Sequence, residues 1–317
     1  MAQSATEQLR VPAGTRSLLL GDTRVSYVPD GEVLLRPREM FPDSTRETWA
    51  AHPELLDRSG SLVASIGGLL VESGDRALLI DAGFGPRSLP PAPDGPRGAI
   101  HGGGLLDQLA RLGRRPEEIE AVAITHLHPD HTGWAWHPAG DLGRPAFAHA
   151  DYLVSAPEWA SHRDQLEPHE AAGLAPNVRT VADGQEVFPG VRMRITAGHT
   201  PGHAEFVISS GGSRLIAFGD ALHSPIQVAH PEWSSAFDHD PVGSAGHRRR
   251  LVAELAEPGT FGFGIHFGDV MFGHAERDGE RLTWRPLERT RRRPERTPRP
   301  LDGRGRPLDN GRRPPAS

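Results

Sequence analysis

Three histidines and one aspartate lie within six consecutive residues, at His126, His128, Asp130 and His131. Imidazole nitrogens and carboxylate oxygens are common protein ligands of divalent transition metals. In an extended chain His126 and His128 project to the same side and can share one ion. Asp130 and His131 follow Pro129, where we expect the chain to turn into a helix, so they point in another direction. The cluster therefore predicts two metal ions side by side.

The elements before the cluster are typical of a layered α/β fold. Residues 121–124 are apolar and predict a buried strand that ends where the cluster begins. Open α/β sheets bind their ligands at the carboxyl ends of such strands. Residues 62–72 and 76–80 predict a hairpin, 105–112 an amphipathic helix ended by Gly113, and 145–149 a further strand. Strands alternating with helices indicate an α/β architecture.

The run Thr-His-Leu-His-Pro-Asp-His-Thr-Gly (125–133) resembles the H-x-H-x-D-H signature of the metallo-β-lactamase-fold hydrolases. That superfamily includes glyoxalase II, N-acyl homoserine lactonases and methyl-parathion-hydrolase-like enzymes. Two later runs, Gly-His-Thr-Pro-Gly-His (198–203) and Gly-Asp (219–220), follow in the family's order. Residues 224–241 are more similar to the lactonase and methyl-parathion-hydrolase-like branch than to glyoxalase II. The resemblance implies an αββα four-layer sandwich with its metal site at one sheet edge.

The resemblance also implies a ligand set. One metal would be held by His126, His128 and His199, and the other by Asp130, His131 and His266, with Asp220 bridging the two. His274 is the alternative to His266, which is favoured because it directly follows the apolar residues 261–265. Asp81 would support the site by contacting metal ligands rather than a metal ion. His203 would hold its own loop by a side-chain hydrogen bond.

The ligand types suggest the metal and its chemistry. Imidazoles and carboxylates, in a chain without cysteine, suit two Zn²⁺, although Mn²⁺, Fe or Co²⁺ could bind the same residues. In such members two ions share a hydroxide whose lowered pKa lets it attack at neutral pH. Asp130 and Asp220 are then expected to act in catalysis as well as in binding. His223, three residues after Asp220, is a candidate proton donor to the leaving group.

The resemblance predicts a metal-dependent hydrolase of an ester-type bond in a small molecule, with a lactone as the leading substrate. Phosphotriester and thioester hydrolysis are alternatives on the same site, because ligand residues define the reaction better than the substrate. An iron-dependent redox enzyme, similar to a persulfide dioxygenase, is the alternative from another class. The sequence leaves open which side chains shape the pocket, and Trp49, Trp134 and Trp233 are candidates by their place in the chain alone. For the segment around Trp49 packing in the core is favoured.

Composition sets the remaining expectations. Residues 1–288 are predicted to form the hydrolase domain, and the Arg/Pro-rich residues 289–317 a disordered tail. The tail carries ten arginines against three acidic residues, a net charge of +7, so the rest carries −13 of the total of −6. An acidic body disfavours nucleic-acid binding. Without a long apolar run or a signal-peptide pattern, we expect a cytoplasmic protein with no membrane partner. An oligomer is compatible with the sequence.

Overall fold

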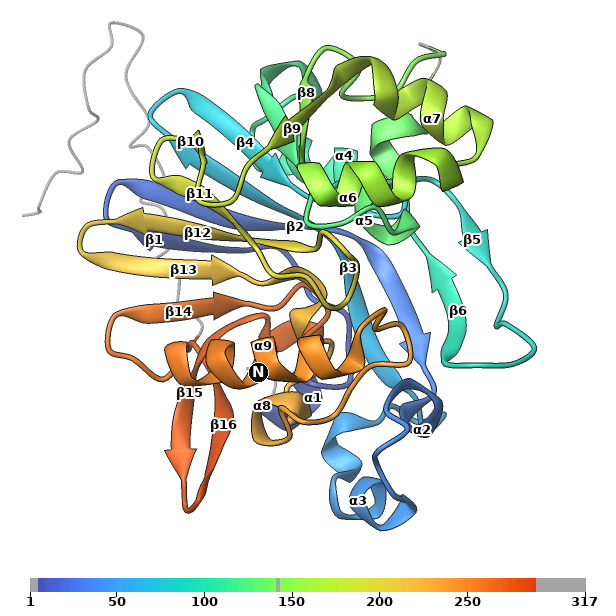
Figure 1. Ribbon diagram of the computed structural model, residues 1–317, viewed down its shortest axis with the longest axis vertical. Coiled ribbons are helices and arrows are strands. Elements are labelled where there is room, and N and C mark those ends of the chain that lie inside the picture. Colours follow the sequence, from blue (N-terminus) through green and yellow to red (C-terminus); the bar gives the residue numbers. More distant parts are fainter. Residues whose placement is uncertain (1–4, 141–142, 289–317) are drawn as a thin grey trace, which may run out of the picture. The chain divides into compact units, whose positions relative to one another are not determined.

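The computed structural model describes residues 5–140 and 143–288, and its strands form two sheets (Figure 1). The larger sheet has nine strands in the order β5-β6-β2-β3-β4-β7-β8-β9, and β1 pairs with β2 beside this path. Its strands are β1 (Arg16–Leu20), β2 (Thr23–Leu35), β3 (Leu62–Ser73), β4 (Arg76–Ile80), β5 (Ser88–Leu89), β6 (Arg97–His101), β7 (Ala121–Ala123), β8 (Asp151–Ser155) and β9 (Val178–Val181).

The second sheet has seven strands in chain order, β10-β11-β12-β13-β14-β15-β16. All neighbours in it are antiparallel except β13 and β14. Its strands are β10 (Glu186–Phe188), β11 (Val191–Ile195), β12 (Ala204–Ser210), β13 (Ser213–Ala217), β14 (Thr260–Phe263), β15 (Phe272–Asp278) and β16 (Arg281–Pro286).

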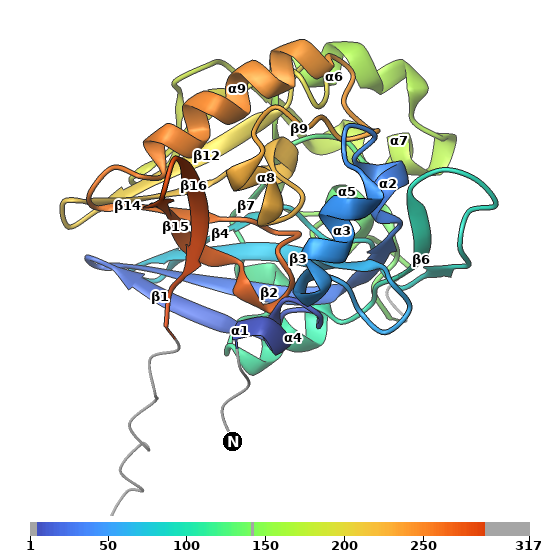
Figure 2. The same ribbon diagram turned by 90° about the horizontal axis from the view of Figure 1, so that it is seen from below.

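Helices cover the outer faces of the two sheets, and this makes the four-layer sandwich that the resemblance implies. Figure 2 shows α9 outside the seven-stranded sheet and α4 outside the nine-stranded sheet. The α-helices are α1 (Ala5–Gln8), α2 (Pro37–Met40), α3 (Arg46–Ala51), α4 (Leu105–Arg111), α5 (Pro129–Trp136), α6 (Ala156–His162), α7 (Pro168–Leu174), α8 (Ile226–Ala229) and α9 (Pro241–Glu254).

The apolar faces of these layers form separate cores. Leu69 and Ile80 of the larger sheet pack with Met193 and Phe206 of the smaller one in the largest cluster. On the other face of the larger sheet, Leu79 and Val122 pack with Leu105 and Leu109 of α4. Because β3 and β4 are buried on both faces, they are nearly continuous apolar runs in the sequence.

Two parallel strand pairs bring polar residues to one place. In the larger sheet β4 pairs in parallel with β7, so Asp81 and His126 both follow at the same edge. In the smaller sheet β13 pairs in parallel with β14, which places Asp220 and His266 just beyond their carboxyl ends. Each sheet therefore delivers its site residues from the ends of neighbouring parallel strands, as expected for an α/β ligand site.

Most of the expected elements are confirmed, but the strand over 145–149 is wrong. Those residues form turns, with hydrogen bonds from Ala148 N to Pro145 O and from Ala150 N to Phe147 O, and the strand begins only at Asp151. Phe147 is apolar because it is buried against the helices, not because it belongs to a sheet. Within the described residues no helix is long and apolar enough to cross a membrane. The predicted tail, 289–317, lies outside the described residues.

Candidate metal centre

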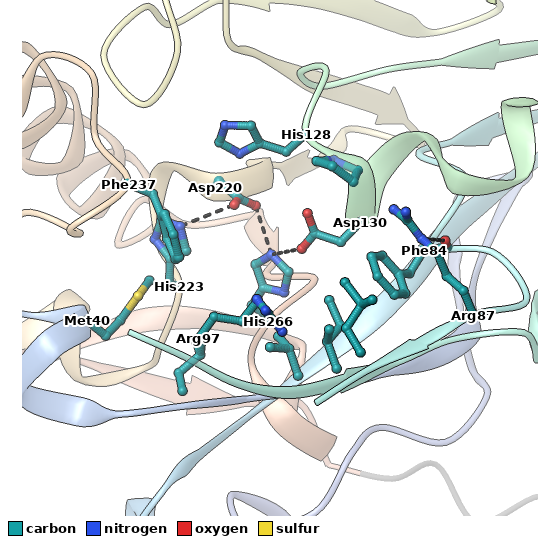
Figure 3. Close-up of a pocket in the computed structure, with 15 residues that line it drawn as sticks. Met40, Phe84, Arg87, Arg97, His128, Asp130, Asp220, His223, Phe237 and His266 are labelled. Atoms are coloured by element: carbon teal, nitrogen blue, oxygen red, sulfur yellow. Dashed lines mark hydrogen bonds and ion pairs between the residues drawn. The ribbon is translucent and has the colours of Figure 1, made fainter. Parts of the chain in front are cut away.

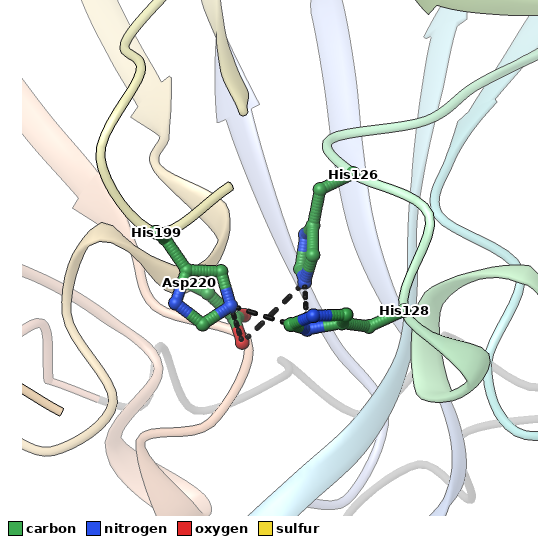
Figure 4. A group of neighbouring side chains, drawn as sticks. All are labelled: His126, His128, His199 and Asp220. Atoms are coloured by element: carbon green, nitrogen blue, oxygen red, sulfur yellow. Dashed lines mark hydrogen bonds and ion pairs between the residues drawn. The ribbon is translucent and has the colours of Figure 1, made fainter. Parts of the chain in front are cut away.

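The structure brings the seven predicted ligands together in two adjoining groups. The first ligand group contains His126, His128, His199 and Asp220 (Figure 4). The second ligand group contains Asp130, His131 and His266. Within each group the candidate ligand atoms all lie within 4.8 Å of one another. His274 is on β15 and pairs in register with Arg285, away from both groups, so the structure supplies His266 and not His274.

The second group's imidazoles are oriented by partners on their far nitrogens. Nδ1 of His131 lies 2.9 Å from Oδ2 of Asp81, and Nδ1 of His266 lies 2.8 Å from the carbonyl oxygen of Ser65. Both partners accept only, so both Nδ1 atoms carry the proton. The Nε2 atoms then face Asp220 Oδ1, at 3.2 Å from His131 and 3.1 Å from His266.

The first group is oriented in the same way. Nδ1 of His199 donates to Oδ1 of Asp238 at 3.1 Å. The hydroxyl of Thr125 donates to Asp81 and accepts from Nδ1 of His126, 3.0 Å away. The Nε2 atoms of His126 and His199 lie 2.9 and 3.2 Å from Nδ1 of His128. These three nitrogens converge on one point. Because Nδ1 of His126 and of His199 carries the proton, each Nε2 atom directs a lone pair to that point.

Asp220 stands between the two groups. Its Oδ2 faces His199 at 3.4 Å and His126 at 3.7 Å, while its Oδ1 faces the second group. Within the described residues, Oδ1 of Asp220 and Nε2 of His131 are both buried without a hydrogen-bond partner. Buried polar atoms without a partner are costly and rare, and two of them facing each other fit a metal ion. The residues present therefore suit metals on both sides of this carboxylate.

The electrostatics differ between the two ligand groups. Burial and the neighbouring His199 lower the pKa of His128 to about 3, which keeps this imidazole neutral. Burial would raise the pKa of Asp220, but the histidines around it, His266 first, hold that pKa well below its usual range. Burial would lower the pKa of His131 and of His266, but the nearby charge of Asp220 raises both above their usual value. Metals bind neutral imidazoles and ionised carboxylates, so an ion in the second group would displace protons from these histidines.

Glu158, which the sequence did not single out, ties together the loops of both sheets. Its side chain is fully buried on α6. Oε1 accepts from Leu127 N at 2.9 Å, and Oε2 accepts from the hydroxyl of Thr200 at 2.6 Å and from Gly202 N at 3.1 Å. A Cβ on Gly202 would lie 2.0 Å from the nitrogen of Glu158, so this approach requires glycine. One carboxylate thus fixes the loops of His126, His128 and His199.

Asp238 and Arg248 form a second support that sequence reasoning missed. Asp238 follows α8 in a loop, and its Oδ2 pairs with Nη1 of Arg248 at 2.9 Å. Arg248 is fully buried on α9 and also donates to Ser234 and to the carbonyl of Pro231. Burial would raise the pKa of Asp238, but His199 and Arg248 lower it below its usual value. The charged aspartate can then hold the proton on Nδ1 of His199.

His203 has the role that the resemblance implies. Its Nδ1 lies 2.9 Å from the hydroxyl of Thr196, and its Nε2 accepts from the backbone nitrogen of Asp220 at 3.1 Å. The ring therefore links its own loop to the loop that presents Asp220.

A cavity of about 360 Å³ opens beside the two groups (Figure 3). His128, Asp130, Asp220, His223 and His266 line it on the side of the ligands. Most of its other walls are apolar, with two arginines among them: Val33, Leu35, Met40, Phe84, Arg87, Leu89, Arg97, Ile100, Pro129 and Phe237.

The three tryptophans that were candidates for the pocket do not line the cavity, and the core packing favoured for the Trp49 segment is confirmed. Trp49 and Trp233 pack against each other and against Phe41 in a buried cluster behind Met40. Trp134 is buried on α5, where its Nε1 donates to Asp30 at 2.8 Å. Their size and their need for a hydrogen-bond partner place them in the core, while smaller side chains face the cavity.

Comparisons with known proteins agree with this fold. The metallo-beta-lactamase superfamily model matches residues 69–271, and the chain belongs to that superfamily. It is 26% identical over 160 residues to an N-acyl homoserine lactonase of Bacillus cereus, a match over 50% of this chain and 60% of the lactonase. It is 29% identical over 210 residues to the acyl-coenzyme A thioesterase MBLAC2 of Gallus gallus, over 61% of this chain and 71% of the thioesterase.

The fold is also that of a solved lactonase. The structure of AidC, described as a dizinc quorum-quenching lactonase with a bound product, superposes with a TM-score of 0.73 at 21% identity. The match covers 87% of this chain and 98% of AidC. Family, fold and site together define a member of the metallo-beta-lactamase superfamily with a candidate metal-binding site.

Proposed function

We propose that this protein is a dinuclear metallohydrolase that opens lactones. The observation that carries the proposal is the carboxylate of Asp220, whose two oxygens face different ligand groups. His126, His128 and His199 would hold one ion, Asp130, His131 and His266 the other, and Asp220 both. Two Zn²⁺ ions in these groups would supply a hydroxide at neutral pH and polarise the carbonyl of the substrate.

The chain's own residues would bind the substrate and deliver a proton to the leaving alkoxide. The apolar cavity excludes water around the ester bond and takes the carbon skeleton of a small molecule. Asp130 lies at the cavity edge, where it can orient the attacking group as well as bind metal. Nε2 of His223 lies 3.2 Å from Oδ2 of Asp220, and neither ring nitrogen has a hydrogen-bond partner among the described residues. Burial lowers the pKa of His223, so its neutral ring would take up the proton of the attacking water and pass it to the leaving alkoxide.

Acid release from N-hexanoyl homoserine lactone, followed in a pH-stat, tests the proposal. We expect Zn²⁺-reconstituted protein to open the ring with two ions bound, and metal-stripped protein to show only the uncatalysed rate. No turnover by protein with two bound Zn²⁺ would contradict lactone opening. The relationship to AidC and to the Bacillus lactonase makes a lactone the first substrate to try.

Thioester hydrolysis is the second candidate, because the MBLAC2 match names an acyl-coenzyme A thioesterase. Release of free thiol from short acyl thioesters, measured on the same metal-loaded sample, distinguishes it. A phosphotriester would be cleaved by the same site with release of a phenol. The redox alternative requires iron, so bound iron with oxygen consumption on a persulfide would replace the hydrolase assignment.

A further inference from the structure

Arg87 is a half-buried cation in the wall of the cavity. It follows Pro86 in the loop before β5, and its guanidinium lies over the ring of Phe84 at 3.9 Å and near the ring of Trp136 at 4.9 Å. Such contacts hold a guanidinium in a fixed plane without using its N–H groups. The side chain is therefore positioned by stacking, with its donors left for another group.

Protein partners use little of this donor capacity. The Nε group donates to the carbonyl of Phe84 at 3.2 Å, and this is the guanidinium's one protein hydrogen bond among the described residues. Within that part of the chain no acidic side chain forms an ion pair with Arg87. Burial lowers the pKa of Arg87, and the charges of Glu170 and Asp130 only partly oppose this effect. Neither carboxylate forms an ion pair with the half-buried guanidinium, so its free N–H groups can bind an anionic ligand directly.

The cavity has two different ends. Figure 3 shows Phe84 and Arg87 on the side of Asp130, and Met40 and Phe237 on the side of His223. If His223 donates its proton to the leaving alkoxide, the alkoxide lies towards Met40 and Phe237. The acyl part of the substrate then extends past Asp130 towards Arg87.

From this arrangement we infer that the preferred substrates carry a carboxylate on the acyl side of the scissile bond, and that Arg87 binds it. The inference rests on the proposed function for the direction in which the substrate lies. A planar carboxylate can accept two hydrogen bonds from the Nη1 and Nη2 edge of this guanidinium, which has no protein partner among the described residues. The cavity of about 360 Å³ favours this compact anion over a bulky one.

Arg97 is a second cavity arginine and provides an internal comparison. Its Nη1 donates to the carbonyl oxygens of Pro90 at 2.9 Å and Gly98 at 3.1 Å, so its guanidinium is engaged in holding its own loop. No ring contact of Arg97 exists among the described residues. Both arginines add positive charge to the cavity, but only Arg87 is stacked with its donors left over.

The test measures binding by calorimetry to the Zn²⁺-loaded protein, using two ring-opened products. These are homoserine N-acylated with adipic acid, ending in a free carboxylate, and the same molecule ending in a carboxamide. We expect the carboxylate form to bind roughly tenfold more tightly or better, as for hydrogen bonds to charged groups. In Arg87→Gln the ratio of the two affinities should fall to about one, and in Arg87→Lys to an intermediate value.

The ratio is independent of the amount of folded protein, so a partly unstable variant still gives an answer. Arg97→Gln and the exposed Arg24→Gln should keep most of the wild-type ratio. A wild-type ratio near one, an unchanged ratio in Arg87→Gln, or its loss in Arg97→Gln instead would overturn the assignment. Turnover of the two corresponding lactones tests the proposed function separately, because the binding ratio needs no catalysis.

Discussion

The two ligand groups are supported in different ways. The second group rests on the sheet itself, because His131 is held by Asp81 at the end of β4 and His266 by a carbonyl within β3. The first group shares Asp81, which reaches His126 through Thr125. It depends in addition on charges from two helices, Glu158 of α6 and Arg248 of α9, which acts through Asp238. The second group is therefore held mainly by the sheet, and the first group mainly by buried ionic contacts. We expect substitutions to disturb the first group more easily.

Removing Glu158 should have the largest effect. Glu158→Ala leaves Leu127 N, Gly202 N and the Thr200 hydroxyl buried without an acceptor, at a cost of about 3 kcal/mol or more in unfolding free energy. We expect a lower denaturation midpoint and loss of metal from the first group. Glu117→Gln, an exposed control, should change neither. Wild-type stability and metal content in Glu158→Ala would show that the loops of His126, His128 and His199 keep their conformation without Glu158.

Asp81→Asn should follow, because Asp81 supports both groups, His131 directly and His126 through Thr125. Its φ of +61° is tolerated by asparagine, so the substitution changes the charge with little backbone strain. We expect metal affinity to fall by roughly 10- to 100-fold. Competition with a chromogenic chelator measures this metal affinity. Equal affinity in the variant and the wild type would show that Asp81 does not support the metal ligands.

Asp238→Asn should weaken only the first group. Asparagine cannot hold the proton of His199 as strongly as a carboxylate, and Arg248 would lose its counterion in a buried site. The chelator titration should show one weakened site, by roughly 10-fold, and one wild-type site. Equal weakening of both sites would contradict the division of support between sheet and helices.

His223→Gln should have the smallest effect on the site and a selective effect on the reaction. His223 faces the cavity but is not needed for either ligand group. We expect both ions to stay bound and kcat to fall by roughly 100-fold on lactones. The loss should shrink with aryl esters, whose leaving groups need no proton. Equal losses on both substrates would mean that His223 is structural.

The same contrast explains what the sequence could predict. His126, His128, Asp130 and His131 lie within six residues, so their spacing alone predicted a metal site. His199, Asp220 and His266 were predicted because their surroundings resemble the family's motifs in the family's order. Glu158, Asp238 and Arg248 lie on helices or loops with no motif, and their roles arise only from packing between distant elements. The strand over 145–149 failed for a related reason, since burial under helices imitates a strand's apolar pattern.

Metal stoichiometry after Zn²⁺ reconstitution tests the central claim, that Asp220 serves two metal sites. Mass spectrometry of the wild type should give two ions per chain. Asp220→Asn should retain at most one and lose lactone hydrolysis by roughly 1,000-fold or more, because one oxygen cannot serve both groups. His274→Gln is the matched control and should keep two ions and full activity. A single ion in the wild type, or two ions and full activity in Asp220→Asn, would contradict the account.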